Sequence, residues 1–339
     1  MPLRIVFCGT PEFAVPALQH LIAQPDIRVE GIVTQPDRPR GRGNEISISP
    51  VKEAALAAGI DVFQPVKVRA PEALAYFERV APDCVVIIAY GQIIPAKLIA
   101  IPRLGWINVH ASLLPKYRGA APINWAIING EKVTGLTTMQ IDPGLDTGPM
   151  LLRTELPIGS DETAPELSVR LAQAGAPLII ETLRRVEASE ITPEPQDNAQ
   201  ATFAPPLKKS DGAIEWDLSS QYIYNRIRGL HPWPGAFTRF RGKICQIWGR
   251  PLLLDLIRAL RSDIETEVRP APPLPELHIR GTERPSLLPG TIRVEKFGIL
   301  ISCGHGSLFL ESIQLEGRKR VTAREFVNGA RLAPGEKFG

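Results

Sequence analysis

The chain has 339 residues, 44% of them hydrophobic, which is typical of two folded domains with sizeable cores. Its formal net charge of +3 is too small to indicate a nucleic-acid partner by itself, so local clusters of charge must decide that question. The four cysteines form no C-x-x-C pair, which argues against a zinc site and against a disulfide framework.

The opening residues, MPLRIVFCGTPEF, lack the long apolar core of a signal peptide. No stretch of the sequence is apolar over the length needed to cross a bilayer. We therefore expect a cytoplasmic protein without a membrane partner. Cys8 and Cys84 lie in apolar, strand-like runs, where we expect them to be unreactive core residues.

The first half of the chain alternates predicted strands with predicted helices. This alternation predicts an α/β fold, doubly wound around a mostly parallel sheet. No G-x-G-x-x-G fingerprint follows the first strand, which argues against nicotinamide binding. The strands are expected at Leu3–Cys8, Arg28–Thr34, Asp61–Gln64 and Cys84–Tyr90, and the helices at Phe13–Ala23, Val51–Ala58 and Pro71–Val80.

Residues 36–44 are polar and rich in proline and glycine, which predicts a loop. Arg38, Arg40 and Arg42 alternate along it, and Asp37 is its only acid. One interpretation is a solvated surface loop. The other is a mobile basic arm that becomes ordered on a partner carrying phosphate groups.

The strand Trp106–Ala111 carries Asn108 and His110 two residues apart, so their side chains project from the same face. An amide can donate to a developing oxyanion, and an imidazole can hold or pass a proton near neutral pH. A second strand, Leu136–Ile141, leads into a Gly-rich turn that contains Asp146. If the two strands pair in parallel, all three side chains reach the carboxyl edge of the sheet. Each of them alone could instead be structural, as a satisfied histidine or a turn-forming aspartate.

The first domain is expected to end with a long helix. A strand at Met150–Leu156 precedes this helix, which should run over Thr163–Ala188 and in which Pro177 can introduce a kink. Residues 1–189 thus form the predicted first domain. Residues 190–208, which are rich in proline, form the predicted linker.

After the linker the pattern changes to short alternating strands separated by glycine turns, preceded by one helix at Ser219–Gly229. This pattern predicts a small β-barrel domain over residues 209–339. Residues 251–285 interrupt the pattern, because they contain a possible helix and then become rich in proline. We interpret them as an insertion.

Basic residues cluster in this second half of the chain. Residues 203–250 contain eight Lys or Arg and three Asp or Glu, which gives a local balance of +5. Scattered solubilising charge is one interpretation. A further cluster at Arg318–Arg320 favours the other, a surface that follows a phosphate backbone. The candidates from the first cluster are Lys208, Lys209, Arg241 and Lys243.

Three motifs carry a resemblance to a known family. They are Asn-Val-His-Ala-Ser-Leu-Leu-Pro at 108–115, Tyr-Arg-Gly-Ala-Ala-Pro-Ile-Asn-Trp-Ala at 117–126 and Asp-Pro-Gly-Leu-Asp-Thr-Gly-Pro at 142–149. Together they resemble the 10-formyltetrahydrofolate-dependent formyltransferases, and most closely the members that act on methionyl-tRNA. The resemblance extends from residues 7–14 to residues 332–339, and only residues 251–285 depart from it.

This resemblance implies an enzyme that moves a formyl group from its co-substrate 10-formyltetrahydrofolate to the free amine of initiator methionyl-tRNA. Asn108, His110 and Asp146 would be catalytic, without a metal, and the second domain would be OB-like. We expect a monomer. The residues expected to bind the folate are Ser112, Leu113, Leu114, Pro115, Tyr90 and Ile93. Those expected to bind the tRNA are Arg42, Arg38, Lys208, Lys209, Arg241 and Lys243.

Three other functions remain open from the residues themselves. A related enzyme could formylate a small amine, or hydrolyse the formylfolate, with the same three side chains and no need for the basic second domain. A tRNA-binding protein without catalysis would bind but not turn over. A nicotinamide oxidoreductase is disfavoured by the missing glycine motif.

Overall fold

The computed structural model describes residues 1–40, 45–252, 288–296, 298–333 and 335–339. The chain forms two compact units, Met1–Ala126 with Glu131–Pro206, and Ile127–Gly130 with Leu207–Gly339. The segment expected to be a linker therefore belongs to the first unit as far as Pro206, because its residues pair with that unit through a short strand. Arg42 and most of the expected insertion lie outside the described residues.

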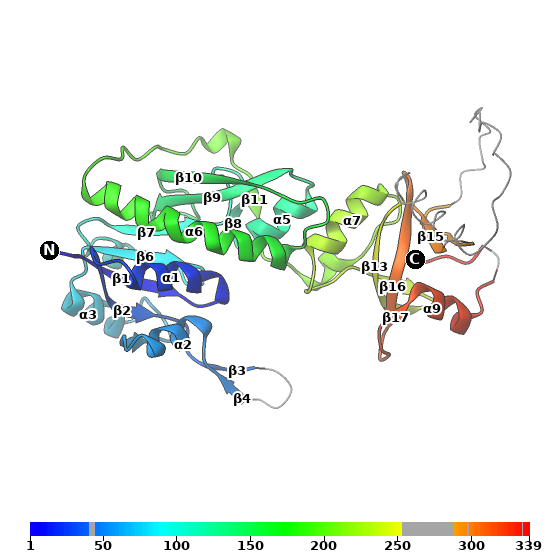
Figure 1. Cartoon of the computed structure of the whole chain (residues 1–339), viewed down its shortest axis with the longest axis horizontal. Helices are drawn as coiled ribbons and strands as arrows, with labels where there is room; N and C mark the ends of the chain where they lie inside the picture. Colours follow the sequence, from blue (N-terminus) through cyan, green and yellow to red (C-terminus); the bar gives the residue numbers. More distant parts are fainter. Residues whose placement is uncertain (41–44, 253–287, 297, 334) are drawn as a thin grey trace, which may run out of the picture. The chain divides into compact units, whose positions relative to one another are not determined.

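The first unit is built on a seven-stranded sheet in the order β10-β9-β7-β6-β1-β2-β5 (Figure 1). The strands from β7 to β5 pair in parallel, whereas β9 and β10 are antiparallel to their neighbours. The predicted doubly wound, mostly parallel sheet is thus confirmed. The strands are β1 (Leu3–Gly9), β2 (Ile27–Val33), β5 (Val62–Phe63), β6 (Cys84–Ile88), β7 (Trp106–His110), β9 (Val133–Gln140) and β10 (Met150–Pro157), with a separate parallel pair β8 (Arg118–Gly119) and β11 (Phe203–Ala204).

Helices cover both faces of this sheet. α1 and α6 pack together on one face, where α6 also contacts β9 and β10. On the other face, Phe77 of α3 and Leu98 of α4 pack in one cluster with Val85 and Trp106 of the sheet. Among the described residues, no helix has both the length and the apolar composition needed to cross a membrane. The helices are α1 (Val15–Ile22), α2 (Pro50–Ala57), α3 (Pro71–Val80), α4 (Ala96–Ile99), α5 (Pro122–Ile128) and α6 (Ala164–Glu187), with 3₁₀ turns η1 (Glu12–Ala14) and η2 (Asn198–Gln200). A third 3₁₀ turn, η3 (Lys209–Gly212), belongs to the second unit.

The segment expected to be an irregular loop over residues 36–44 is partly regular. Its flanks pair as an antiparallel hairpin of β3 (Arg38–Arg40) and β4 (Glu45–Ser47). The proline in β3 is compatible with this pairing because both strands of a two-stranded ribbon are edge strands. At the base of the hairpin, the Lys52 ammonium lies 2.5 Å from Asp37 Oδ2 and forms an ion pair with it.

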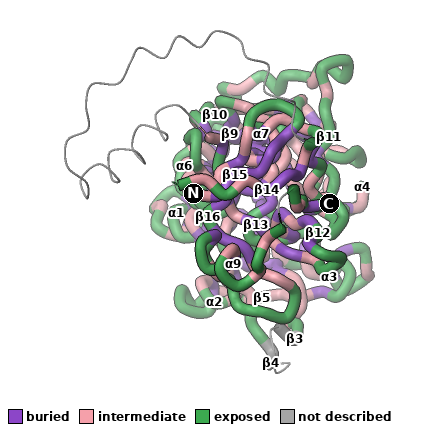
Figure 2. The backbone as a smooth tube through the Cα atoms, turned by 90° about the vertical axis from the view of Figure 1, so that its right-hand side faces the viewer, coloured by how far each residue is buried: buried purple, intermediate pink, exposed green. Residues whose placement is uncertain are grey.

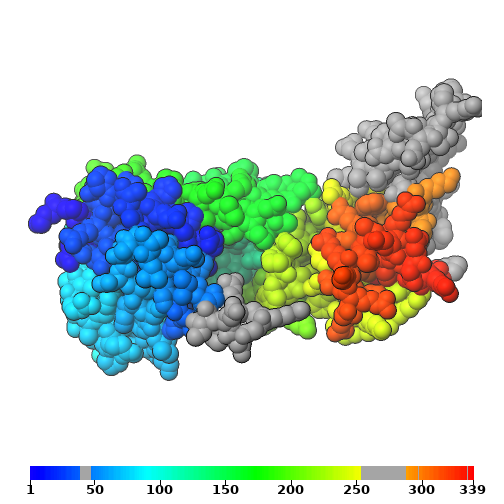
Figure 3. Space-filling view, turned by 60° about the horizontal axis from the view of Figure 1, so that its bottom comes forward, coloured from blue at the N-terminus to red at the C-terminus, as the bar shows by residue number. Residues whose placement is uncertain are grey.

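The second unit is built on an antiparallel sheet in the order β12-β13-β16-β15-β14, and β17 pairs with β16. β15 is buried over four of its five residues, whereas buried and more exposed residues alternate along β13 and over most of β16 (Figure 2). Its C-terminal residues, orange and red, gather together on its surface (Figure 3). The predicted short strands separated by turns are confirmed. The elements are α7 (Ser220–Gly229), β12 (Phe237–Phe240), β13 (Lys243–Pro251), β14 (Ile292–Glu295), β15 (Gly298–Ser302), β16 (Ser307–Leu315), β17 (Val321–Thr322) and α9 (Ala323–Ala330).

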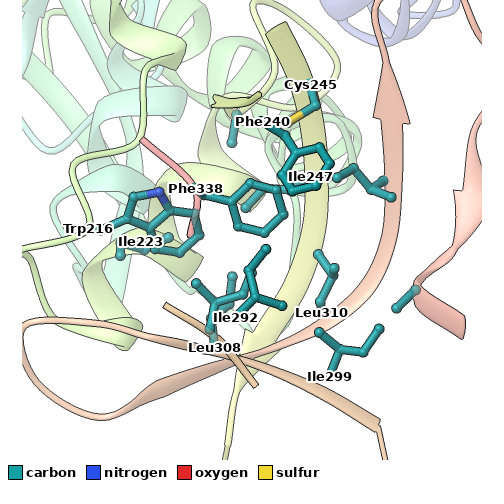
Figure 4. Close-up of a cluster of buried hydrophobic side chains, with 14 of the residues drawn as sticks. Trp216, Ile223, Phe240, Cys245, Ile247, Ile292, Ile299, Leu308, Leu310 and Phe338 are labelled. Carbon is teal, nitrogen blue, oxygen red and sulfur yellow. The ribbon is translucent and has the colours of Figure 1, made fainter. Parts of the chain in front are cut away.

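Aromatic rings pack among aliphatic side chains in the core of the second unit (Figure 4). The ring of Phe338 stacks on Trp216 with a centroid distance of 5.9 Å and lies 5.6 Å from the ring of Phe240. Trp216 Nε1 donates to Thr238 Oγ1 at 3.1 Å, so the one polar atom of the indole is satisfied inside the core. The C-terminal segment is therefore part of this core.

Replacing Phe338 with alanine should lower the free energy of unfolding of the second unit by about 3–5 kcal/mol, because a buried aromatic side chain leaves a cavity that closes only in part. Urea denaturation monitored by near-UV circular dichroism measures this loss. Val294→Ala, at an exposed position, is the control and should change little. A loss below about 1 kcal/mol for Phe338→Ala would contradict the described packing.

Candidate active site

Asn108 and His110 lie on β7, between β6 and β9 in the sheet. A side chain built on Gly175 of α6 would contact Val109, so α6 covers the face of β7 from which Val109 projects. Because successive side chains of a strand alternate, Asn108 and His110 project from the opposite face. His110 is buried and Asn108 is partly exposed. The two side chains thus share one face, as their spacing predicts.

Asp146 reaches His110 by a route that differs from the prediction. β9 runs antiparallel to β7, so the turn after β9 begins at the amino end of β7 and the expected shared carboxyl edge is wrong. The turn instead folds back, and Asp146 Oδ2 comes to 3.7 Å from His110 Nδ1. Gly148 permits this return, because a Cβ there would lie 1.9 Å from the carbonyl oxygen of Gln140.

Hydrogen bonds define the orientation of the His110 ring. Its Nε2 lies 2.9 Å from the carbonyl oxygen of Tyr117, and since a carbonyl only accepts, Nε2 must carry a proton. Nδ1 is therefore the nitrogen that faces Asp146 and can take up or release a proton. The backbone N–H of Gly119 donates to Asp146 Oδ2 at 2.9 Å and holds the carboxylate in place.

A cavity of about 630 Å³ opens beside these side chains. Asn108, His110 and Asp146 line it, together with the segment after β6 and the start of α5. The Asn108 side chain forms no hydrogen bond within the described ranges of the chain, so its amide is available to a ligand. An uncharged donor, an imidazole and a carboxylate therefore converge on a space large enough for a small molecule.

The residues expected to bind a folate fall into two groups. Tyr90 and Ile93 line the cavity. The other four, Ser112, Leu113, Leu114 and Pro115, are not part of its lining. The Ser112 hydroxyl is buried and donates to the Lys116 carbonyl at 2.6 Å, so it is used to close its own loop. The role of these four residues in folate binding stays a prediction.

Other lining residues were not singled out from the sequence. Asn124, on α5, lies within the 117–126 motif, and its position there was the available signal. Phe13 lies in η1 and Ser168 in α6, and no local pattern marks them. Only the folding of the sheet brings such distant segments to one cavity.

Of the residues expected to bind tRNA, all but Arg42 lie in the described part of the chain. Arg241 is held by both carboxylate oxygens of Glu336, at 2.5 and 2.9 Å. This pairing raises the pKa of Arg241 and lowers the pKa of Glu336. It also occupies two of the guanidinium donors that a phosphate would otherwise contact. The remaining candidates, Arg38, Lys208, Lys209 and Lys243, are exposed.

The fold and this site agree with the results of comparisons with known proteins. A formyl transferase family model matches residues 3–183, and a model of the formyl transferase C-terminal domain matches residues 206–331. The chain therefore belongs to the formyl transferase family. It is 48% identical over 338 residues to methionyl-tRNA formyltransferase of Koribacter versatilis, covering 99% of this chain and 98% of that protein. It is 43% identical over 338 residues to methionyl-tRNA formyltransferase of Acetivibrio thermocellus, covering 99% of this chain and 100% of that protein.

Solved structures share this fold at lower sequence identity. WlaRD, a sugar 3N-formyl transferase, has a TM-score of 0.60 and 16% identity, and the match covers 94% of this chain and 100% of that one. HypX from Aquifex aeolicus, in complex with tetrahydrofolic acid, has a TM-score of 0.56 and 14% identity, covering 96% of this chain and 47% of that one. Identities this low support the fold alone.

The cysteines of the chain are buried, as expected for Cys8 and Cys84. Burial raises the pKa of Cys303 to about 11 and of Cys245 to about 12, and it also raises the pKa of Cys8 and Cys84 above the ordinary thiol value. A raised pKa keeps a thiol protonated at neutral pH, and only the thiolate is a strong nucleophile. None of the four is therefore a candidate nucleophile.

Native protein treated with iodoacetamide at pH 8 should gain almost no adduct, whereas protein unfolded in guanidinium should gain four. The physical reason is that thiolate formation requires the native core to open first. Intact-mass spectrometry of both samples measures the difference. Labelling of native protein at the rate of free cysteine would contradict the buried placement of at least one thiol.

Proposed function

We propose that this protein transfers the formyl group of 10-formyltetrahydrofolate to the α-amine of initiator methionyl-tRNA, in the cytoplasm. The observation that carries this proposal is the near full-length identity of 43–48% to methionyl-tRNA formyltransferases. The convergence of Asn108, His110 and Asp146 on one cavity supplies a chemistry that fits it.

In this proposal the formyl group of the folate and the amine of the methionyl group meet beside Asn108. The folate occupies the cavity, with its pterin beside the segment after β6, where Tyr90 and Ile93 lie. The neutral amine of the methionyl group attacks the formyl carbon, and the carbonyl oxygen becomes an oxyanion. The Asn108 amide donates to this oxygen, where a preorganised neutral donor stabilises charge that develops in the transition state.

His110 and Asp146 remove the proton that the attacking nitrogen must lose. His110 Nδ1 accepts it, while Nε2 stays bonded to the Tyr117 carbonyl and keeps the ring oriented. The Asp146 carboxylate, 3.7 Å from Nδ1, stabilises the imidazolium that results. Collapse of the tetrahedral intermediate then breaks the bond to the folate nitrogen, which receives the proton and leaves as tetrahydrofolate.

The acceptor is held through its phosphates. The exposed residues Lys208, Lys209 and Lys243 lie in or at the start of the basic second unit, and Arg38 lies in the hairpin of the first unit. Arg42, four residues further along the sequence, is a further candidate and lies outside the described residues. Each phosphate contact releases counterions, so these residues add affinity that depends on salt.

The direct test mixes the purified protein with methionyl-tRNA and 10-formyltetrahydrofolate labelled in the formyl group. Labelled formylmethionine released from the tRNA is the expected product. A related small-amine formyltransferase would instead label an amine such as an aminosugar, and a hydrolase would release formate without tRNA. Tight tRNA binding with no turnover would indicate a binding protein and contradict the proposal.

Asn108→Ala should fold normally and transfer formyl about 100- to 1,000-fold more slowly, because one donor to the oxyanion is lost. Single-turnover kinetics at saturating substrates measure the chemical step. Asn328→Ala, at an exposed position on α9, is the control and should react at the wild-type rate. A near-normal single-turnover rate for Asn108→Ala would exclude this role.

The double variant Lys208→Gln, Lys209→Gln should weaken tRNA binding most at low salt. Each lost phosphate contact should make the slope of log affinity against log salt shallower by about 1. Fluorescence titration at several salt concentrations measures the slope. Lys132→Gln, an exposed lysine of the first unit, is the control. Equal slopes for the double variant and wild type would exclude these lysines from the tRNA contact.

A further inference from the structure

The segment before the second unit contacts the turn that carries Asp146. Gln196 lies in this segment, and its Nε2 donates two hydrogen bonds, one to the Asp146 carbonyl and one to the Gly148 carbonyl, both at 2.8 Å. The two protons of one amide thus hold the turn on both sides of Thr147. No other part of the proposed mechanism uses Gln196.

Arg118 determines which way the Gln196 amide faces. Its Nε donates to Gln196 Oε1 at 2.9 Å, and its second terminal nitrogen donates to Asn198 Oδ1 at 3.0 Å. An arginine can only donate, so the oxygen of Gln196 must face Arg118 and the nitrogen must face the turn. Arg118 is buried, at 4% exposure, so its guanidinium depends on these acceptors.

The turn needs such support because its backbone is in an uncommon conformation. Asp146 has a φ of +52°, in the left-handed region that residues other than glycine seldom adopt. This conformation turns the carboxylate toward the Gly119 N–H and His110 Nδ1. Strained backbone of this kind persists only where the surroundings hold it.

The same segment also contacts the residue whose carbonyl orients His110. Thr202 Oγ1 accepts from the Tyr117 N–H at 2.9 Å, and the Thr202 carbonyl accepts from the Arg118 N–H at 2.9 Å. Tyr117 is the residue whose carbonyl holds His110 Nε2. Both partners of the His110–Asp146 pair are therefore positioned by contacts to residues 196–202.

We propose that Gln196 is a positioning residue for formyl transfer, which acts through Asp146 and not on the substrates. The kinetic part of this proposal rests on the proposed function. Gln196 holds the Asp146 carboxylate at His110 Nδ1, and Arg118 holds Gln196. Its loss should therefore reduce the rate of proton removal and leave the binding of both substrates unchanged.

Gln196→Glu is the variant that separates positioning from stability. A glutamate keeps the size of the side chain and still accepts from Arg118, now as an ion pair. It cannot donate to the Asp146 and Gly148 carbonyls, so the turn loses both bonds. The control is Gln200→Ala, because the Gln200 amide bonds only to Asp197 among the described residues.

For Gln196→Glu we expect kcat to fall by about 100-fold, as small misplacements of catalytic groups can cost this much, with unchanged KM values and a protein that stays folded at the assay temperature. In an Asp146→Asn background, adding Gln196→Glu should cost little more, because both changes act through one group. Gln200→Ala should keep wild-type kcat. Wild-type kcat in Gln196→Glu, a rise in KM alone, or fully additive losses in the double variant would overturn the proposal.

A second readout does not depend on activity. Hydrogen exchange of the Gly119 amide, measured by NMR, should accelerate in Gln196→Glu, because its acceptor on Asp146 is no longer held. Unchanged exchange would overturn the proposal even if the wild type formylates methionyl-tRNA. Accelerated exchange in a protein that transfers no formyl group would support the positioning contact and reject only the proposed function. If Gln196→Glu does not fold, Gln196→Asn, which is too short to reach both carbonyls, replaces it in both experiments.

Discussion

The hydrogen bond between His110 Nε2 and the Tyr117 carbonyl is the interaction on which the rest of the site depends. A neutral imidazole has one proton for two nitrogens, so a carbonyl that fixes the proton on Nε2 leaves a lone pair on Nδ1. The carboxylate of Asp146 then lies 3.7 Å from Nδ1. The orientations of the imidazole and of the carboxylate are thus set by the protein's own hydrogen bonds.

How far the sequence predicts this molecule depends on whether a feature is local. The shared face of Asn108 and His110 follows from the two-residue period of a strand, and the alternation of strands and helices predicts the sheet. The direction of β9 does not follow from the local pattern, because strand pairing is decided by contacts between residues far apart in the chain. The sequence therefore did not predict how the turn after β9 brings Asp146 to His110. Ser112 carries a polar group that looks available in sequence, but its own loop uses it.

The basic residues illustrate the same limit. Counting charges over residues 203–250 treats all arginines alike, yet Arg241 is bound by Glu336, which lies 95 residues away. Arg228 is buried beside Asn225, and Arg250 pairs with Glu311. Asn225 lies on the same helix as Arg228, but Glu336 and Glu311 are 95 and 61 residues away from their arginines, so no short window of sequence reveals these two ion pairs. The residues whose charge remains at the surface are a smaller group than the composition indicates.

The tight return of the chain at Gly148 has a consequence for how mutational data on this protein are interpreted. Alanine is the usual mildest replacement, but here its methyl group would collide with the carbonyl oxygen of Gln140. The turn would have to open, and Asp146, two residues earlier, would move with it. A mutational scan would then rank Gly148 among the most sensitive positions of the enzyme, although it has no side chain and no group that takes part in the chemistry. A loss of activity on substitution of Gly148 would therefore reflect the shape of the turn and not a chemical role of this residue.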